Sequence, residues 1–292
     1  MIKQTNGEKI FAFFNYTILL LFGLSIVYPV IYCISASFSG VEAFINGEVV
    51  LFPKHFTLSA YQYLLEDTKI WIAYGNTVFY TLFGTTASIS ISVFGAYALS
   101  KTRLRGRKFI NFMLMFTMWF HAGMIPFYLN IKELGLLNTR TAIVFAFACS
   151  TFNIILLRTY FSVVPKELEE AAIVDGANDL YVLFKIFIPI SMPAIATITL
   201  FYAVGRWNAY FWTMVLITDD YKMPLQVVLK KMLTVLSATD EFTQTSSDTF
   251  ISYGKETVIY ATIVIAALPM LIVYPFIQKF FIKGVMVGAI KG

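Results

Sequence analysis

The chain has 292 residues, of which 58% are hydrophobic and only 13% are charged. Soluble domains carry roughly 25% charged residues, so this composition excludes an ordinary soluble domain and indicates a membrane-embedded protein. The formal net charge is +5, but the basic residues lie beside hydrophobic segments, and this pattern favours anchoring at the membrane over binding to nucleic acid.

Apolar runs with few charges divide the chain into six predicted membrane spans, because a helix needs about 20 apolar residues to cross the hydrocarbon core. The spans are predicted at about 11–35, 72–100, 109–129, 139–160, 190–217 and 258–281. The first follows two lysines and exceeds the usual hydrophobic region of a signal peptide, so we expect an uncleaved helix. The sequence therefore predicts an all-α membrane protein with six transmembrane helices.

The short link 101–108 sets the predicted orientation, because it holds five basic residues and no acidic one. By the positive-inside rule this link faces the cytoplasm. With six spans, the segment 165–189 and both termini are then cytoplasmic as well. Lysines near the two ends agree: Lys3, Lys9, Lys279, Lys283 and Lys291. The outer connections carry mixed charge, and their acidic residues are Glu42, Glu48, Glu66, Asp67, Asp219, Asp220, Asp240, Glu241 and Asp248.

The last outer loop, at about 218–256, is the longest connection of the chain. It contains an amphipathic stretch that ends near Leu236 and a polar patch at 243–247. Such a loop could cap a pore or meet an external partner, and a solvated connector is an equally open interpretation.

The cytoplasmic segment 165–189 predicts a helix–turn–helix. Pro165 suits a first helical turn, where its missing N–H would have no partner. The glutamates that follow, Glu167, Glu169 and Glu170, place negative charge near the positive helix end. Gly176 is expected to end the helix in a left-handed turn. The small residues Ala171 and Ala172 would permit close approach of a partner.

A second short helix is expected after Asn178 or Asp179, either of which can cap it. Its apolar stripe is predicted to contain Leu180, Leu183, Phe184 and Phe187. The pair of helices could dock into a groove of a partner protein. From periodicity alone, an amphipathic pair lying on the membrane interface is an equal alternative.

The order of residues in this segment resembles the EAA loop of ABC importer permeases. That pattern is EAA, three residues, G, nine residues and I-x-L-P, and it is matched by Glu170-Ala171-Ala172, Gly176 and the run 186–189, with Ile188 in place of leucine. In that family the loop inserts into a cleft of a cytoplasmic ATPase. The resemblance therefore implies this coupling role for Glu170, Ala171, Ala172, Asp175 and Gly176.

The tail 278–292 (QKFFIKGVMVGAIKG) resembles the C-terminal signature of carbohydrate-type permeases, close to the second maltose-permease subunit and its complex-oligosaccharide branch. Trp207-Asn208 and the run 224–226 look like the same subfamily. The resemblance implies a type I permease fold in the bacterial cytoplasmic membrane. It implies a first helix and outer loop over 1–71, a type-1 transmembrane core over 72–281 with its coupling loop, and a cytoplasmic tail over 282–292.

The implied partners are a second permease subunit, two ATPase subunits, an extracytoplasmic solute-binding protein, an oligosaccharide substrate and the lipid bilayer. The chain has no P-loop pattern, so ATP and magnesium are expected at the partner ATPases and no cofactor is expected on this chain. We see no paired-carboxylate or Ser/His/Asp arrangement and predict a non-catalytic subunit. Cys33 and Cys149 lie in apolar spans and are interpreted as small buried residues, and no spacing indicates a metal site.

Polar residues inside predicted spans are candidates for the substrate pathway, because they are costly in lipid and usually face a pore or another subunit. The candidates are Trp207, Asn208, Asn153 and His121. His121 lies beside Gly123 and Pro126, where a helix break is expected, so a structural hydrogen bond is its alternative role. Arg206 could reach the interface or pair within the assembly. Asn76 and the small-residue run 84–88 could line a pore, but helix packing is the favoured interpretation of the run, because small residues let backbones approach closely.

Two other functions remain open on the sequence. A permease of the same machinery could carry amino acids or another small solute. A secondary carrier without ATPases is the alternative from a different class, and it predicts inverted repeats and intramembrane charge pairs. We see no convincing repeat, and Arg206 is the only charged residue within the predicted span 190–217. A membrane-embedded enzyme fits least well.

Overall fold

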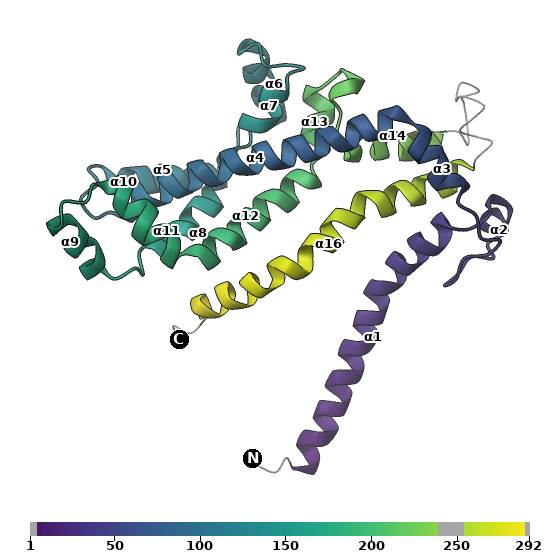
Figure 1. Ribbon diagram of the computed structural model, residues 1–292, viewed down its shortest axis with the longest axis horizontal. Coiled ribbons are helices and arrows are strands. Elements are labelled where there is room, and N and C mark those ends of the chain that lie inside the picture. The colour runs from purple at the N-terminus through teal and green to yellow at the C-terminus, as the bar shows by residue number, and fades with distance from the viewer. Residues whose placement is uncertain (1–4, 239–253, 290–292) are drawn as a thin grey trace. The chain divides into compact units, whose positions relative to one another are not determined.

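The computed structural model describes residues 5–238 and 254–289, and every secondary-structure element in these ranges is a helix (Figure 1). The predicted polar patch 243–247 lies outside the described residues, as do the side chains of the tail signature 278–292. The chain divides into two compact units, 1–68 with 229–268 and 69–228 with 269–292.

The first unit contains the N-terminal helix and part of the last one. Its helices are α1 (Asn6–Ser37), α2 (Val41–Ile45), α3 (Ser59–Glu66), the end of α14 (Leu225–Ala238) and the first part of α16 (Lys255–Ala289). Tyr260 of α16 packs its ring against Tyr32 of α1 and Phe44 of α2, with ring centroids 5.7 and 5.4 Å apart. These aromatic contacts join the two ends of the chain into one unit.

Helix α1 starts at a capping box, in which Thr5 Oγ1 accepts from the backbone N–H of Glu8 and Glu8 Oε2 accepts from the backbone N–H of Thr5. Most of its large apolar side chains are exposed within this chain, from Phe11 at 72% to Ile31 at 38%. A continuous apolar helix surface of this kind is left for lipid or for another subunit to cover.

The second unit holds most of the chain. Its helices are α4 (Thr68–Ser100), α5 (Arg107–Trp119), α6 (Met124–Glu133), α7 (Arg140–Phe145), α8 (Thr151–Phe161), α9 (Lys166–Val174), α10 (Asp179–Val182), the π-helix η1 (Leu183–Phe187), α11 (Ile188–Ile190), α12 (Met192–Trp207), α13 (Phe211–Leu216), the 3-10 turn η2 (Asp220–Lys222) and the start of α14. Helix α8 packs on both α5 and α12, and α7 packs on α13, so helices far apart in the sequence meet in this unit.

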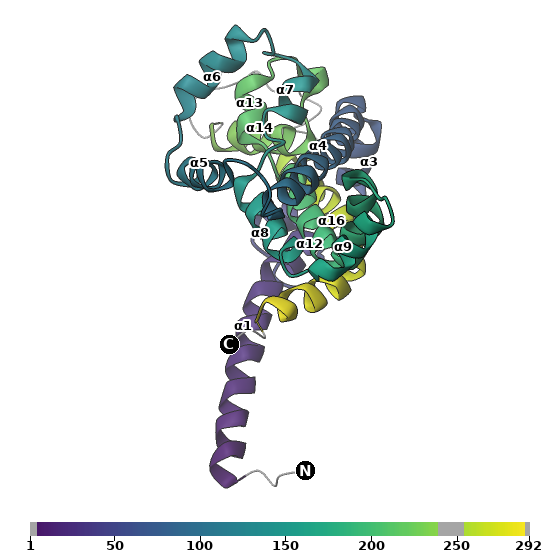
Figure 2. The same ribbon diagram turned by 90° about the vertical axis from the view of Figure 1, so that its left-hand side faces the viewer.

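Several of the predicted spans are broken helices. Three helices are long and apolar enough to cross a membrane alone: Asn6–Ser37, Thr68–Ser100 and Glu256–Pro275. Two further candidates are bent pairs, α5 with α6 at 115° and the segment Asp179–Ile190 with α12 at 85°. The described residues therefore contain three to five candidate spans. The bend between α5 and α6 is plain in Figure 2 and lies where His121, Gly123 and Pro126 predict a break.

The predicted span 139–160 is also interrupted. It consists of α7 and α8, and residues 146–150 between them are not helical. Thr139 and Ser150 each cap the helix that follows, because their hydroxyls accept from the backbone N–H of Ala142 and Asn153. The span was expected as one helix because apolar composition does not reveal a break made by local caps.

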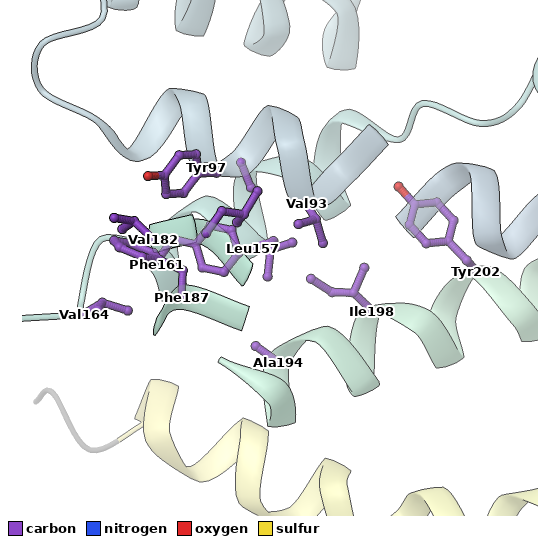
Figure 3. Packing of buried hydrophobic residues seen from close by; sticks show 12 residues of the cluster. Val93, Tyr97, Leu157, Phe161, Val164, Val182, Phe187, Ala194, Ile198 and Tyr202 are labelled. Atoms are coloured by element: carbon purple, nitrogen blue, oxygen red, sulfur yellow. The ribbon is translucent and has the colours of Figure 1, made fainter. Parts of the chain in front are cut away.

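Two apolar clusters stabilise the second unit. The first joins α4, α8, η1 and α12 through residues such as Tyr97, Leu157, Phe187 and Ile198, which point toward one another in Figure 3. The second joins α4, α6, α7 and α13 through residues such as Tyr80, Ile143 and Leu216. Helix α4 contributes to both clusters and is the element that connects them.

Candidate functional site

The predicted cytoplasmic helix is observed as α9, which follows Pro165 directly. It ends at Gly176, whose φ of 85° is in the left-handed region. The N–H of Gly176 donates to the carbonyl of Ile173 at 3.0 Å, and that of Ala177 donates to the carbonyl of Ala172 at 2.9 Å. These two bonds form a Schellman motif, which stops the helix and turns the chain. The expected left-handed end at Gly176 is confirmed.

The tip of this helix–turn–helix is exposed. Glu170, Ala171, Asp175 and Gly176 are all exposed, and Ala172 is half-buried against the first apolar cluster. Val174 is 87% exposed. The five residues to which the resemblance assigns coupling thus lie together at the exposed tip of the helix–turn–helix, residues 170–176, which we call the knuckle.

Lys101 fastens α9 to the end of α4. Its ammonium lies 2.6 Å from Glu169 Oε2, and it lies 4.2 and 3.9 Å from the ring centroids of Tyr97 and Phe187. Lys101 is only 8% exposed, so the ammonium is enclosed by a carboxylate and two ring faces. Burial lowers the pKa of Lys101, whereas Glu169 acts in the opposite direction and favours the charged form.

A second ion pair joins the same link to the second helix of the helix–turn–helix. Arg103 pairs with Asp179, and both side chains are more than half exposed. Asn178 caps α10, because its Oδ1 accepts from the N–H of Tyr181 at 2.8 Å. The predicted apolar stripe is correct at Leu183 and Phe187, which are buried, and wrong at Leu180 and Phe184, which are exposed. Phe184 lies inside the π-helical turn η1, where the regular helical register is changed, whereas Leu180 precedes this turn in α10.

A separate cavity of about 450 Å³ lies near the second apolar cluster. Its lining is mainly aromatic: Tyr80, Phe147, Phe201, Tyr202, Tyr210, Phe211 and Trp212. Polar groups on its wall are Ser150, Asn153, Arg206, Asn208 and Thr213. This volume and this mixture of many apolar walls and few polar groups are typical of a site for a small organic ligand.

The structure brings two of the four predicted pathway residues to this cavity. Asn153, at the start of α8, and Asn208, at the end of α12, both line it. Trp207 is buried outside the lining, and its ring meets Tyr74 edge-on at 5.9 Å. His121 is exposed in the bend between α5 and α6, also outside the lining.

Arg206 lies in α12 and reaches the end of α7. It donates hydrogen bonds to the carbonyls of Ile143 and Val144, the latter at 3.0 Å, and to Ser88 Oγ at 3.3 Å. These carbonyls belong to the last turn of α7, where the helix break leaves acceptors without intrahelical partners. Gly84 of α4 makes room for this arginine, since a Cβ there would lie 3.0 Å from Arg206 Nε.

The segment before α14 is anchored to the first half of α4. Asn76 donates through its Nδ2 to the carbonyls of Tyr221 and Met223 at 2.8 and 3.1 Å. Thr77 Oγ1 accepts from the N–H of Leu225 at 2.8 Å, and the hydroxyl of Tyr80 donates to the carbonyl of Lys222 at 2.8 Å. Asn76 therefore holds a connection in place, which agrees with the packing interpretation and does not line the cavity.

Residues whose role depends on contacts far along the chain were not predicted from the sequence. Lys101 and Arg103 were used only as part of a basic link, and Glu169 only as a helix N-terminal charge. The aromatic lining of the cavity was not predicted either. The one available signal was the density of aromatic residues in 201–212, where six of the twelve positions are Phe, Tyr or Trp.

The described residues, whose regular elements are all helices, combine broken apolar spans, an exposed helix–turn–helix tip and a cavity among apolar helices. These are the parts of a transport permease. Residues 70–287 match the model of the family described as "Binding-protein-dependent transport system inner membrane component". The chain belongs to this family of ABC importer permeases, as the EAA resemblance implied. Members are non-catalytic membrane subunits of transport systems.

Individual relatives cover the whole chain. The polygalacturonan/rhamnogalacturonan transport system permease protein YtcP of Bacillus subtilis is 41% identical, with 98% of this chain and 99% of that protein covered. Protein LplC of the same organism is 38% identical, with 100% and 98% covered. A chain in the crystal structure of a bacterial ABC transporter involved in the import of the acidic polysaccharide alginate is 46% identical, with a TM-score of 0.90 and 96% and 100% covered.

Proposed function

We propose that this protein is one transmembrane subunit of an ATP-driven importer that moves an oligosaccharide across the cytoplasmic membrane. Relatives with sugar or polysaccharide substrates in their names support the substrate class, and they cover the chain nearly from end to end. A second permease subunit, two ATPase subunits and an external solute-binding protein complete the proposed assembly. ATP and magnesium bind to the ATPases and not to this chain.

The proposed topology has six spans with both termini in the cytoplasm. The spans are α1, α4, α5 with α6, α7 with α8, the segment 179–207, and α16. Broken helices are tolerated at membrane depth where protein or a cavity covers the free backbone groups. The contact of Arg206 with the end of α7 is such a case. The five basic residues of 101–108 support the cytoplasmic placement of α9.

The proposed coupling mechanism uses α9 as a rigid lever. The observation that carries it is the enclosed ion pair between Lys101 and Glu169, which fastens an exposed knuckle to the end of α4. A docked ATPase that moves α9 therefore also moves α4, which contributes to both apolar clusters. Coupling requires the knuckle to interact differently with the two states of the ATPase pair.

The proposed substrate pathway passes the aromatic cavity. Ring faces of the lining stack on sugar rings, and the amides of Asn153 and Asn208 bond sugar hydroxyls. Trp207 supports this wall from behind through its contact with Tyr74. His121 belongs to the proposed pathway through its place in the bend of the third span.

The test of the coupling mechanism is a crosslink between the knuckle and an ATPase subunit. Cysteine at Val174 or Ala172 is expected to form a disulfide with a cysteine placed in the ATPase cleft of the assembled importer. The matched control is a cysteine at Val163, which is 57% exposed but lies before α9. Sugar uptake that stays intact while neither Val174→Cys nor Ala172→Cys crosslinks to any ATPase would contradict the proposal.

A further inference from the structure

Arg206 carries a buried positive charge without a carboxylate partner among the described residues. It is 9% exposed, and its three hydrogen-bond acceptors are two backbone carbonyls and a serine hydroxyl. By contrast, Lys101 and Arg103 each pair with an acidic side chain. Neutral acceptors satisfy the hydrogen-bonding groups of an arginine but do not cancel its charge.

The end of α7 supplies only partial compensation. Helix C-termini carry about half a negative charge, and that effect falls off within one turn. Helix α7 has only six residues, so its aligned dipoles are few. A positive potential therefore remains at the guanidinium, in surroundings that screen it less than water does.

The guanidinium also has unused donors. Arginine has five N–H groups, and three of them donate to the acceptors named above within the described residues. Arg206 lines the aromatic cavity of about 450 Å³, together with Asn153 and Asn208. The cavity thus combines ring faces for sugar rings, amides for hydroxyls and a cation that can attract a carboxylate.

We infer that Arg206 makes this cavity selective for sugars that carry a carboxylate, such as oligomers of uronic acids. The inference rests on the proposed function of the chain as a sugar-importer subunit. The charge acts on the sugar carboxylate through a direct hydrogen bond or through the field inside the cavity. Both routes require the positive charge of Arg206 and not its shape. A purely structural role at the end of α7 would not make uptake depend on the charge of the sugar, so the two roles can be distinguished.

The experiment uses the complete importer reconstituted in vesicles with its partner permease, ATPases and binding protein. The probes are an oligogalacturonate and the same oligomer with every carboxylate methyl-esterified, so that the pair differs in charge and hardly in shape. Initial ATP-dependent uptake is measured for both probes. The same binding protein serves every variant, so its own preference cancels when the acid-to-ester ratio is compared between variants.

Arg206→Gln removes the charge and keeps hydrogen-bond donors, and it is expected to lower the acid-to-ester uptake ratio by about tenfold. Arg206→Lys keeps the charge and is expected to retain the ratio within about twofold. An equal loss of both probes in Arg206→Gln, or an unchanged ratio, would overturn the inference and leave Arg206 as a support of the broken span. Uptake of the ester alone by the natural importer would overturn it as well.

Asn153→Asp tests the same charge without touching Arg206, in case the glutamine variant does not assemble. It places a carboxylate on the cavity wall and is expected to lower the ratio in the same direction. An unchanged ratio in assembled Asn153→Asp would count against the inference. An importer that shows no ATP-dependent uptake of any sugar would refute the proposed function itself. Sugar uptake with a charge-independent ratio would refute only the role of Arg206.

Discussion

The two ends of the second unit handle buried positive charge in opposite ways. At the coupling end, Lys101 meets the carboxylate of Glu169 at 2.6 Å and two aromatic faces. At the cavity end, the hydrogen bonds of Arg206 to the described residues go only to carbonyls and a hydroxyl. The first arrangement cancels charge and fastens one helix to another. The second arrangement leaves charge in place, which fits the mechanical role proposed for one end and the recognition role proposed for the other.

Lys101→Met gives the strongest test of whether the Lys101–Glu169 pair connects α9 to α4 during coupling. It leaves Glu169 partly buried without its cation, which costs about 3 kcal/mol in buried pairs, and it frees α9 from α4. Uptake per ATP hydrolysed is expected to fall about tenfold or more, while ATPase activity persists. Transport and hydrolysis are measured together in reconstituted vesicles.

Lys101→Arg is the control for that variant, because it keeps the charge near Glu169 and the ring faces. It is expected to restore at least part of the coupling ratio. If Lys101→Met lowered ATPase activity and uptake in equal proportion, the lysine would be needed for assembly and not for coupling.

Two glycines of α4, Gly84 and Gly95, test whether Arg206 needs the space that a missing side chain leaves beside it. A Cβ at Gly84 would meet Arg206 Nε at 3.0 Å, whereas a Cβ at Gly95 would meet Ile154 at an ordinary 3.7 Å. Gly84→Ala is expected to displace Arg206 from the end of α7 and to destabilise the complex by about 1–3 kcal/mol. Gly95→Ala is expected to be neutral or stabilising by up to about 1 kcal/mol, since alanine favours the helix.

Thermal unfolding of the purified complexes measures both alanine variants. Equal stability of the two would show that Arg206 does not need the space at Gly84. The comparison is informative because the two glycines lie on the same helix and change by the same single methyl group.

Gly176→Ala tests whether the end of the coupling helix must be turned sharply. Its φ of 85° costs about 1–2 kcal/mol for a residue with a side chain. We expect a modest loss of sugar-stimulated ATPase activity, because the knuckle is held less firmly in its docking shape. Asparagine tolerates the left-handed region better than alanine, so Gly176→Asn is expected to show an activity between those of the natural importer and Gly176→Ala. A Gly176→Ala importer with fully normal stimulation would argue against a rigid turn.

Arg103→Ala is expected to have the smallest effect. The pair with Asp179 has 56% and 58% of its side chains exposed, and such surface pairs contribute about 0–1 kcal/mol. Its removal should change coupling by less than about twofold and should matter even less at high salt. A loss as large as that of Lys101→Met would show that the exposed pair also transmits force, and the contrast drawn from burial would be wrong.

Much of the coupling knuckle was predictable from the sequence. Pro165 and Gly176 act on the backbone within one or two turns, so the start and the end of α9 follow from these residues alone. The long apolar helices α1 and α4 were predictable for a similar reason, because their composition already meets the length needed to cross lipid. The number of spans stays a prediction, as bent and interrupted helices occupy the positions of the others.

The register of the helix after the knuckle could not be predicted. Leu180 and Phe184 were expected on the buried face, and both are exposed; Phe184 lies in the π-helical turn, and Leu180 lies in α10 before it. A prediction from periodicity assumes a uniform helix, so a single π-helical turn changes which residues share a face. The break between α7 and α8 was not predicted either, because Ser150 caps a new helix inside a run whose composition is mostly apolar.

The amino-acid sequence by itself determined that this chain belongs in a membrane and where α9 stops, and it predicts which side of the membrane its basic link faces. These features depend on hydrophobicity, charge and caps that act between near neighbours. Only the tertiary structure decided that Lys101 is enclosed by Glu169, Tyr97 and Phe187, and that Arg206 meets the end of α7 beside an aromatic cavity. Such contacts join residues far apart in the chain, and their energies depend on burial, which exists only after the helices have packed.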